Sequence, residues 1–112
     1  MMKINLFSAV ILAAIGTVSA AQAEDAVALS LSVKNHVFSS TEVKLPAGKI
    51  VLLTVSNEDP TSIEFENKPL KIEKVIAGHS SAVIRIKVPA SGKILFVDEP
   101  REDKTLGYFI VE

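Results

Sequence analysis

The amino-acid sequence predicts an all-β protein, an antiparallel β-sandwich with Greek-key connections. Apolar and polar residues alternate through several short runs, which is the period of a strand with one buried face. Turn residues separate the runs, and no stretch after Ala23 has the spacing of an amphipathic helix. About six to eight short strands at this spacing are typical of a sandwich of two sheets.

The predicted strands follow one another along the chain. The first covers 27–33, where odd-numbered positions are apolar and even-numbered ones are small or polar. The continuous apolar run 50–55 is typical of a central strand. Alternation returns in 82–88, 94–97 and 106–111. The turn signals are Pro46-Ala47-Gly48, Asn57-Glu58-Asp59-Pro60, Ala77-Gly78-His79 and Pro89-Ala90-Ser91-Gly92.

Residues 1–23 have the three parts of a secretory signal peptide: the basic residue Lys3, an apolar run from Leu6 to Val18, and small residues at Ala21 and Ala23. The apolar run is shorter than the roughly 20 residues that a membrane-spanning helix needs, and nothing after Ala23 resembles a second span. We therefore expect cleavage after Ala23, a single domain at 24–112 and a periplasmic location. A leader that stays attached as an anchor is the alternative.

Charge and composition exclude several classes of function. Of the 12 basic residues only Lys3 lies in the leader, so 11 basic and 13 acidic residues follow it, a net charge of −2. This balance offers no basic patch for nucleic acid or for an anionic membrane. The chain has no cysteine, so no disulfide supplements its modest core. No arrangement of nucleophile, base and orienting acid is recognisable, and the five glycines form no phosphate loop.

Two carboxylates stand out in the segment Ile63-Glu64-Phe65-Glu66. In an extended strand Glu64 and Glu66 project from one face, and Ile63 and Phe65 project from the other. Neighbouring carboxylates repel each other unless a cation or a basic side chain lies between them. The pair is therefore a candidate metal site; the alternative is a solvated strand face neutralised by Lys68, Lys71 or Arg101.

A series of short motifs follows in a fixed order through the sequence after the leader. The series is His36-Val37-Phe38, Pro46-Ala47-Gly48-Lys49, Val55-Ser56-Asn57-Glu58-Asp59, Ile63-Glu64-Phe65-Glu66, Glu73-Lys74-Val75-Ile76, Gly92 and Gly107-Tyr108-Phe109-Ile110-Val111. In this order and spacing it resembles the cupredoxin-like domains of bacterial periplasmic iron-uptake systems. The resemblance implies a cupredoxin-like sandwich, with Glu-Phe-Glu and Glu-Lys-Val-Ile as its most diagnostic parts.

The sequence departs from electron-transfer cupredoxins at the positions of their copper ligands. A blue-copper ion needs two His and one Cys, and this chain has no Cys. Ile63 stands where those relatives carry the first copper histidine, and Arg101 stands near the position of the histidine in their C-terminal loop. Blue-copper electron transfer is therefore excluded on chemical grounds.

An oxygen-rich set of candidate ligands remains: Glu64, Glu66, Asp98, Glu99 and His36. Carboxylates with at most one imidazole suit iron or manganese, and Cu(II) is tolerable. The resemblance implies iron or copper binding through the Glu-aromatic-Glu segment together with loop residues, with the C-terminal loop at the same end of the sandwich as Glu64. Structural roles are the alternatives for His36 and for the loop pair Asp98 and Glu99.

Two functions of different class follow. The first is a periplasmic cupredoxin-like component of a ferrous-iron uptake system, which binds iron or copper, assists iron oxidation or delivery, and works with an inner-membrane iron permease or a periplasmic iron-binding protein. A ferroxidase-like reaction is the only enzymatic role that the residues support. The second is a metal-free docking module, which would follow if Arg101 pairs with Glu64 or Glu66 and fills the space of a metal.

Overall fold

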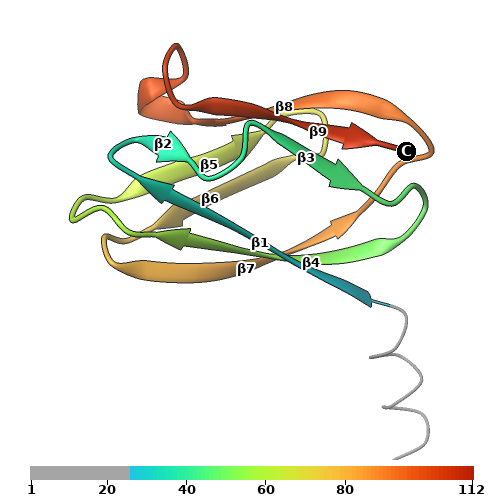
Figure 1. Cartoon of the computed structure of the whole chain (residues 1–112), viewed down its shortest axis with the longest axis horizontal. Coiled ribbons are helices and arrows are strands. Elements are labelled where there is room, and N and C mark those ends of the chain that lie inside the picture. Colours follow the sequence, from blue (N-terminus) through green and yellow to red (C-terminus); the bar gives the residue numbers. More distant parts are fainter. Residues whose placement is uncertain (1–25) are drawn as a thin grey trace, which may run out of the picture.

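The computed structural model describes residues 26–112, which form a sandwich of two β-sheets (Figure 1). The predicted signal peptide at 1–23 lies outside the described residues. The strands are β1 (Ala26–Lys34), β2 (Val37–Phe38), β3 (Glu42–Leu45), β4 (Ile50–Asn57), β5 (Ile63–Asn67), β6 (Ile72–Ile76), β7 (Ser80–Lys87), β8 (Gly92–Asp98) and β9 (Leu106–Val111). A 3-10 turn, η1 (Glu99–Arg101), follows β8. Within 26–112 no helix is long and apolar enough to cross a membrane.

One sheet has four strands in the order β2-β1-β4-β7, and the other has five in the order β3-β9-β8-β5-β6. The predicted all-β sandwich is confirmed, but its sheets are mixed, because β1 runs parallel to β4 and β3 runs parallel to β9. The reason is the path of the chain. After β1 it crosses to the other sheet to form β3 and returns as β4, so neighbours in one sheet are joined by a crossover and not by a hairpin.

The described residues form nine strands, more than the sequence predicted. The extra strands are short: β2 has two residues and β3 has four, which is too few to show a period. The predicted central strand is confirmed, since β4 lies between β1 and β7. The turn at His79 is also confirmed, and His79 is exposed with a positive φ of 54°.

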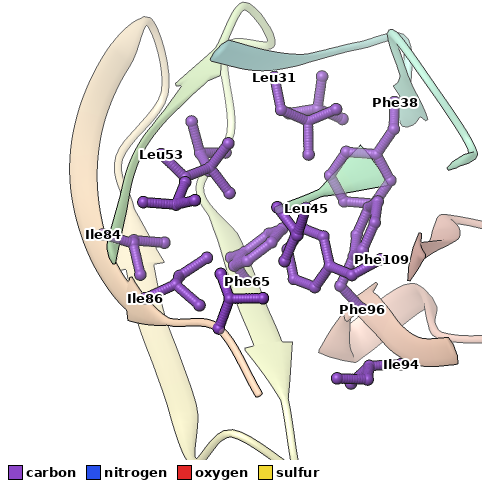
Figure 2. Packing of buried hydrophobic residues seen from close by; sticks show 14 of the residues in the cluster. Leu31, Phe38, Leu45, Leu53, Phe65, Ile84, Ile86, Ile94, Phe96 and Phe109 are labelled. Carbon is purple, nitrogen blue, oxygen red and sulfur yellow. The ribbon is translucent and has the colours of Figure 1, made fainter. Parts of the chain in front are cut away.

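Four phenylalanines hold the two sheets together at the centre of the core (Figure 2). Phe96 lies 4.7 Å from Phe109, 5.0 Å from Phe38 and 5.5 Å from Phe65, measured between ring centroids. Aliphatic side chains from the four-stranded sheet pack around these rings: Leu31, Val33, Val51, Leu53, Val55, Ile84 and Ile86. Because Phe65 is fully buried, β5 has one fixed inner face, and its outward side chains are held on a rigid support.

Candidate functional site

Three carboxylates meet on the outer face of the β5–β6 hairpin. Burial alternates along β5, so Ile63, Phe65 and Asn67 point inward while Glu64 and Glu66 point outward. Glu66 pairs directly with Glu73 across the hairpin, which places both side chains on one face. Glu64, Glu66 and Glu73 each offer an oxygen within 4.8 Å of the others. We call these three residues the acidic cluster.

No basic side chain of the described residues 26–112 forms an ion pair with the acidic cluster. The ion pairs in this range involve neither Glu64 nor Glu66 nor Glu73. A side-chain hydrogen bond with Glu73 raises the pKa of Glu64 above its usual value, and desolvation and the charges of Glu99, Glu73 and Glu66 add to the rise. Glu64 therefore holds a proton more readily than an isolated glutamate does, and a cation could take the place of that proton.

The sequence predicted the shared face of Glu64 and Glu66 correctly but gave Glu73 no part in the site. The signal for Glu73 was present in the hairpin. A four-residue turn at 68–71 joins Asn67 to Ile72, so residues at equal distances from the turn lie opposite each other, and Glu66 faces Glu73. Counting outward from the Lys68-Pro69 turn would have identified it.

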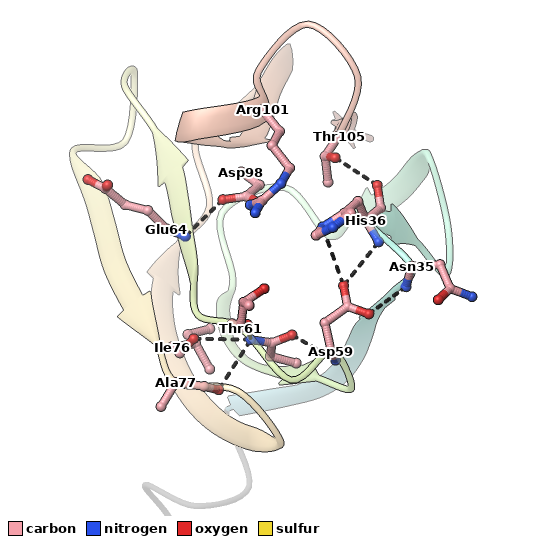
Figure 3. Close-up of polar contacts among 11 residues, drawn as sticks. Asn35, His36, Asp59, Thr61, Glu64, Ile76, Ala77, Asp98, Arg101 and Thr105 are labelled. Carbon is pink, nitrogen blue, oxygen red and sulfur yellow. Dashed lines mark hydrogen bonds and ion pairs between the residues drawn. The ribbon is translucent and has the colours of Figure 1, made fainter.

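Asp98 lies at the expected end of the sandwich, but its side chain does not join the acidic cluster. It pairs with Phe65 in the sheet, and it therefore shares the inward face of β5. Its side chain is fully buried, and both oxygens are taken: Oδ1 accepts from the backbone N–H of Glu64 at 2.9 Å, and Oδ2 accepts from Nη1 of Arg101 at 2.8 Å. Figure 3 shows the Glu64 side chain directed away from this pair.

The pairing of Arg101 with Glu64 or Glu66, which the sequence left open as an alternative to metal binding, is not the one that the structure shows. Arg101 binds Asp98 instead, because the 3-10 turn of η1 places the guanidinium three residues beyond the carboxylate and over the end of the core. The loop is closed further by Asp98 N–H donating to the carbonyl of Thr105 and by Thr105 N–H donating to that of Arg101. Arg101 therefore organises the C-terminal loop and forms no ion pair with the acidic cluster.

His36 is held by Asp59 and is not brought to the acidic cluster. Asn35 and His36 have positive φ values of 52° and 60°, and their backbone N–H groups donate to the two oxygens of Asp59 at 2.6 and 3.0 Å. His36 Nδ1 lies 3.6 Å from Asp59 Oδ2. The hydrogen bond from His36 N–H is the largest cause of the lowered pKa of Asp59. His36 thus has the structural role that the sequence left open as the alternative.

Glu99 is exposed at the start of η1, close enough to the acidic cluster for its charge to raise the pKa of Glu64. It contributes negative potential to the cluster, although it is not one of the three residues whose oxygens converge. Of the five candidate ligands in the sequence, the structure therefore brings together Glu64 and Glu66, with Glu99 beside them. Asp98 and His36 belong to a separate polar group at the end of the sandwich.

A sequence model of the cupredoxin-like domain matches residues 6–111. The chain belongs to the cupredoxin-like domain family. An uncharacterized protein of Rickettsia prowazekii (strain Madrid E) is 29% identical over 83 residues, which are 74% of this chain and 66% of that protein. The cupredoxin-like chain therefore matches just under two thirds of that relative's length.

Solved structures show the same fold at low sequence identity. The metal-binding domain of the Cu(I)-exporting P-type ATPase CopA of Streptococcus pneumoniae has a TM-score of 0.71 and 16% identity, covering 79% of this chain and 87% of that domain. Auracyanin A, a blue copper protein of Chloroflexus aurantiacus, has a TM-score of 0.64 and 13% identity, covering 78% of this chain and 99% of auracyanin. Amicyanin of Paracoccus versutus has a TM-score of 0.61 and 16% identity, covering 76% of this chain and 81% of amicyanin. At these identities the likeness establishes the fold alone.

The residues of this cupredoxin-like protein do not fit a blue-copper ion. The chain has no cysteine, so the thiolate that such a site needs is absent. In the C-terminal loop, where the resemblance places copper ligands, Asp98 already accepts two hydrogen bonds and Arg101 already supplies a positive charge. An additional cation there would be repelled by the guanidinium and would have to displace it.

Proposed function

We propose that this cupredoxin-like protein is a periplasmic metal-binding component of a ferrous-iron uptake system, and that it holds its cation at the acidic cluster. The observation that carries the proposal is the convergence of three carboxylates within 4.8 Å of one another, with which no basic side chain of residues 26–112 forms an ion pair. Oxygen ligands of this kind suit iron and manganese, and Cu(II) is tolerable. The family membership supports metal binding, since its structural neighbours include copper proteins.

The residues suggest how the cation would be handled. Phe65 fixes the direction of Glu64 and Glu66 from the core side, and the hairpin register brings Glu73 to them. All three side chains lie on the outer face of a sheet, so a bound ion would be accessible to a delivering or receiving partner. Carboxylate oxygens hold Fe(III) more tightly than Fe(II), so the cluster would retain iron after a separate oxidant, such as dioxygen, has taken an electron from it. An iron permease or an iron-binding periplasmic protein is the partner that such a role requires.

Metal titration of the mature protein tests this proposal. Fe(II) under anoxic conditions, Mn(II) and Cu(II) are titrated into wild type and into the double variant Glu64→Gln, Glu66→Gln. We expect saturable binding at micromolar concentrations and a loss of about tenfold or more in affinity in the double variant, because two of three charged ligands are gone. Glu42→Gln is the matched control, since Glu42 is exposed on β3 at the opposite edge of the same sheet.

A second candidate function, a metal-free docking module, is favoured by the Asp98–Arg101 pair. This pair puts the guanidinium of Arg101 in the loop where the resemblance places copper ligands, and it takes up an oxygen of Asp98 that a metal would need there. The first candidate would be refuted if none of the three ions bound saturably and if cells carrying the double variant took up iron as well as wild type. The second candidate would then remain.

A further inference from the structure

The outer face of the five-stranded sheet carries an apolar stripe beside the acidic cluster. The register places Leu95 opposite Tyr108 and Val97 opposite Leu106, and Val97 also pairs with Glu66 of β5. These side chains share the outer face of β8, β9 and β5. The outer face of the other sheet also exposes large apolar side chains, Leu52 and Val83, among small or hydroxylated ones such as Ser30. The stripe differs from them because it lies beside the acidic cluster.

A pocket of about 250 Å³ opens where the stripe meets the acidic cluster. Its apolar walls are Pro69, Leu95 and Val97, and its polar rim is Glu66, Lys68 and Glu102. Leu95 is 42% exposed although it is a large aliphatic side chain. Cavities of about 150 Å³ with apolar walls accept a benzene ring, so this pocket has room for one aromatic or branched side chain.

The charge around the pocket is strongly unbalanced. Glu66 and Glu102 lie on the rim, the rest of the acidic cluster continues from Glu66 along the hairpin, and Glu99 is near Glu64. Lys68 is the single basic residue of the rim. An apolar group that enters the pocket therefore arrives in a negative potential, which favours an occupant with a positive charge beside its apolar part.

We propose that this pocket binds a segment of a partner protein in which an aromatic or branched apolar side chain is flanked by Lys or Arg. The inference gives the docking function a surface and a partner chemistry, and it rests on that function and not on metal binding. A second copy of this chain is a poorer occupant. Its exposed apolar side chains with a basic neighbour are Val37 opposite Lys34, Val75 beside Lys74, and Val83 near Arg85. All three lie on strands, whereas the pocket accepts one protruding side chain.

The test uses the isotopically labelled mature protein in EDTA, observed by amide chemical shifts. The probe is a short synthetic peptide with one Phe flanked on both sides by Lys, and the matched probe replaces each Lys by Glu. We expect saturable shifts with the Lys peptide at 66–69, 95–97 and 102, and no saturation with the Glu peptide. Leu95→Gln should weaken binding about tenfold, because it removes an apolar wall. Leu52→Gln, at an exposed leucine of the other sheet, should leave the affinity for the Lys peptide unchanged.

Glu102→Gln changes a charge outside the acidic cluster. It should lower the affinity for the Lys peptide and make that binding less dependent on salt. Equal binding of the two peptides, shifts centred on β4 and β7, or an equal effect of Leu52→Gln would overturn the proposal. So would concentration-dependent dimerisation that displaces the peptide. Because EDTA removes metal and neither Leu95 nor Glu102 belongs to the acidic cluster, failure here is distinct from failure of the metal titration.

Discussion

Arg101 and Asp98 form an ion pair across 2.8 Å, with the carboxylate fully buried and the guanidinium side chain 32% exposed. The second oxygen of Asp98 accepts the backbone N–H of Glu64, so one carboxylate connects the C-terminal loop to β5. Both oxygens are compensated by donors, which is the condition under which a buried charge is tolerated. The pair thus fixes β5, whose outward side chains Glu64 and Glu66 belong to the acidic cluster (Figure 3).

Arg101→Ala should destabilise the fold. The substitution leaves Asp98 buried with one oxygen unpaired, and loss of a hydrogen bond to a charged group costs about 1.5–3 kcal/mol. Urea unfolding measures the difference. Arg85→Ala is the control, because Arg85 is exposed on β7 and its loss should change stability by less than about 0.5 kcal/mol. Equal stabilities of the two variants would show that the pair contributes nothing.

The sequence predicted the parts of the site that depend on local periodicity. Alternation in Ile63-Glu64-Phe65-Glu66 was enough to assign Phe65 to the core and both glutamates to one outward face, and the structure agrees. The central strand at 50–55 was predicted from its continuous apolar run. Such signals need only one strand, since the side-chain period is set by the backbone.

The rest of the site depended on contacts between distant segments. Asp98 reads as a polar loop residue, but β8 continues through it, and its pairing with Phe65 turns the carboxylate inward. Arg101 pairs with Asp98 and not with Glu64 because the η1 turn places it there. This turn has no clear sequence signal, since it is only three residues long. Parallel pairing of β1 with β4 likewise follows from a crossover that no single motif encodes.

Glu64→Gln should stabilise the protein near neutral pH. The folded pKa of Glu64 lies above its usual value of about 4.5, so the native state binds more protons than the unfolded state and loses stability as the pH rises through that pKa. The variant lacks this titration, and its advantage over wild type should disappear as the pH falls towards about 4.5. Thermal unfolding across pH 4 to 8 measures it, roughly spanning the titration range of Glu. Glu42→Gln should show no such trend.

Asp59→Asn should have the opposite pH dependence. The folded pKa of Asp59 lies below its usual value of about 3.8, so its stabilisation is present above that pH and is lost as the pH falls through the folded pKa. Near neutral pH the variant should be less stable by about 1.5–3 kcal/mol, because the backbone N–H groups of Asn35 and His36 lose a charged acceptor. In acid the difference in the free energy of unfolding between wild type and Asp59→Asn should become smaller. The exposed neighbour variant Glu58→Gln should match wild type in urea unfolding at both pH values.

Saturating metal should stabilise the protein, and the effect should separate the acidic cluster from the Asp98–Arg101 pair. A ligand that binds only the folded state at one hundred times its Kd adds about 2.7 kcal/mol to the free energy of unfolding. We expect this increment with Mn(II) in wild type and its loss in the double variant Glu64→Gln, Glu66→Gln, both followed by urea unfolding.

Arg101→Ala should retain that increment above its own lower baseline, because Arg101 contacts Asp98 and has no ion pair with the acidic cluster. EDTA should return each protein to its metal-free curve. An increment that survives in the double variant, or one that grows in Arg101→Ala, would place the cation at the loop end of the sandwich, where Asp98 is freed when the guanidinium is removed. The acidic cluster would then be only a solvated face of the sheet.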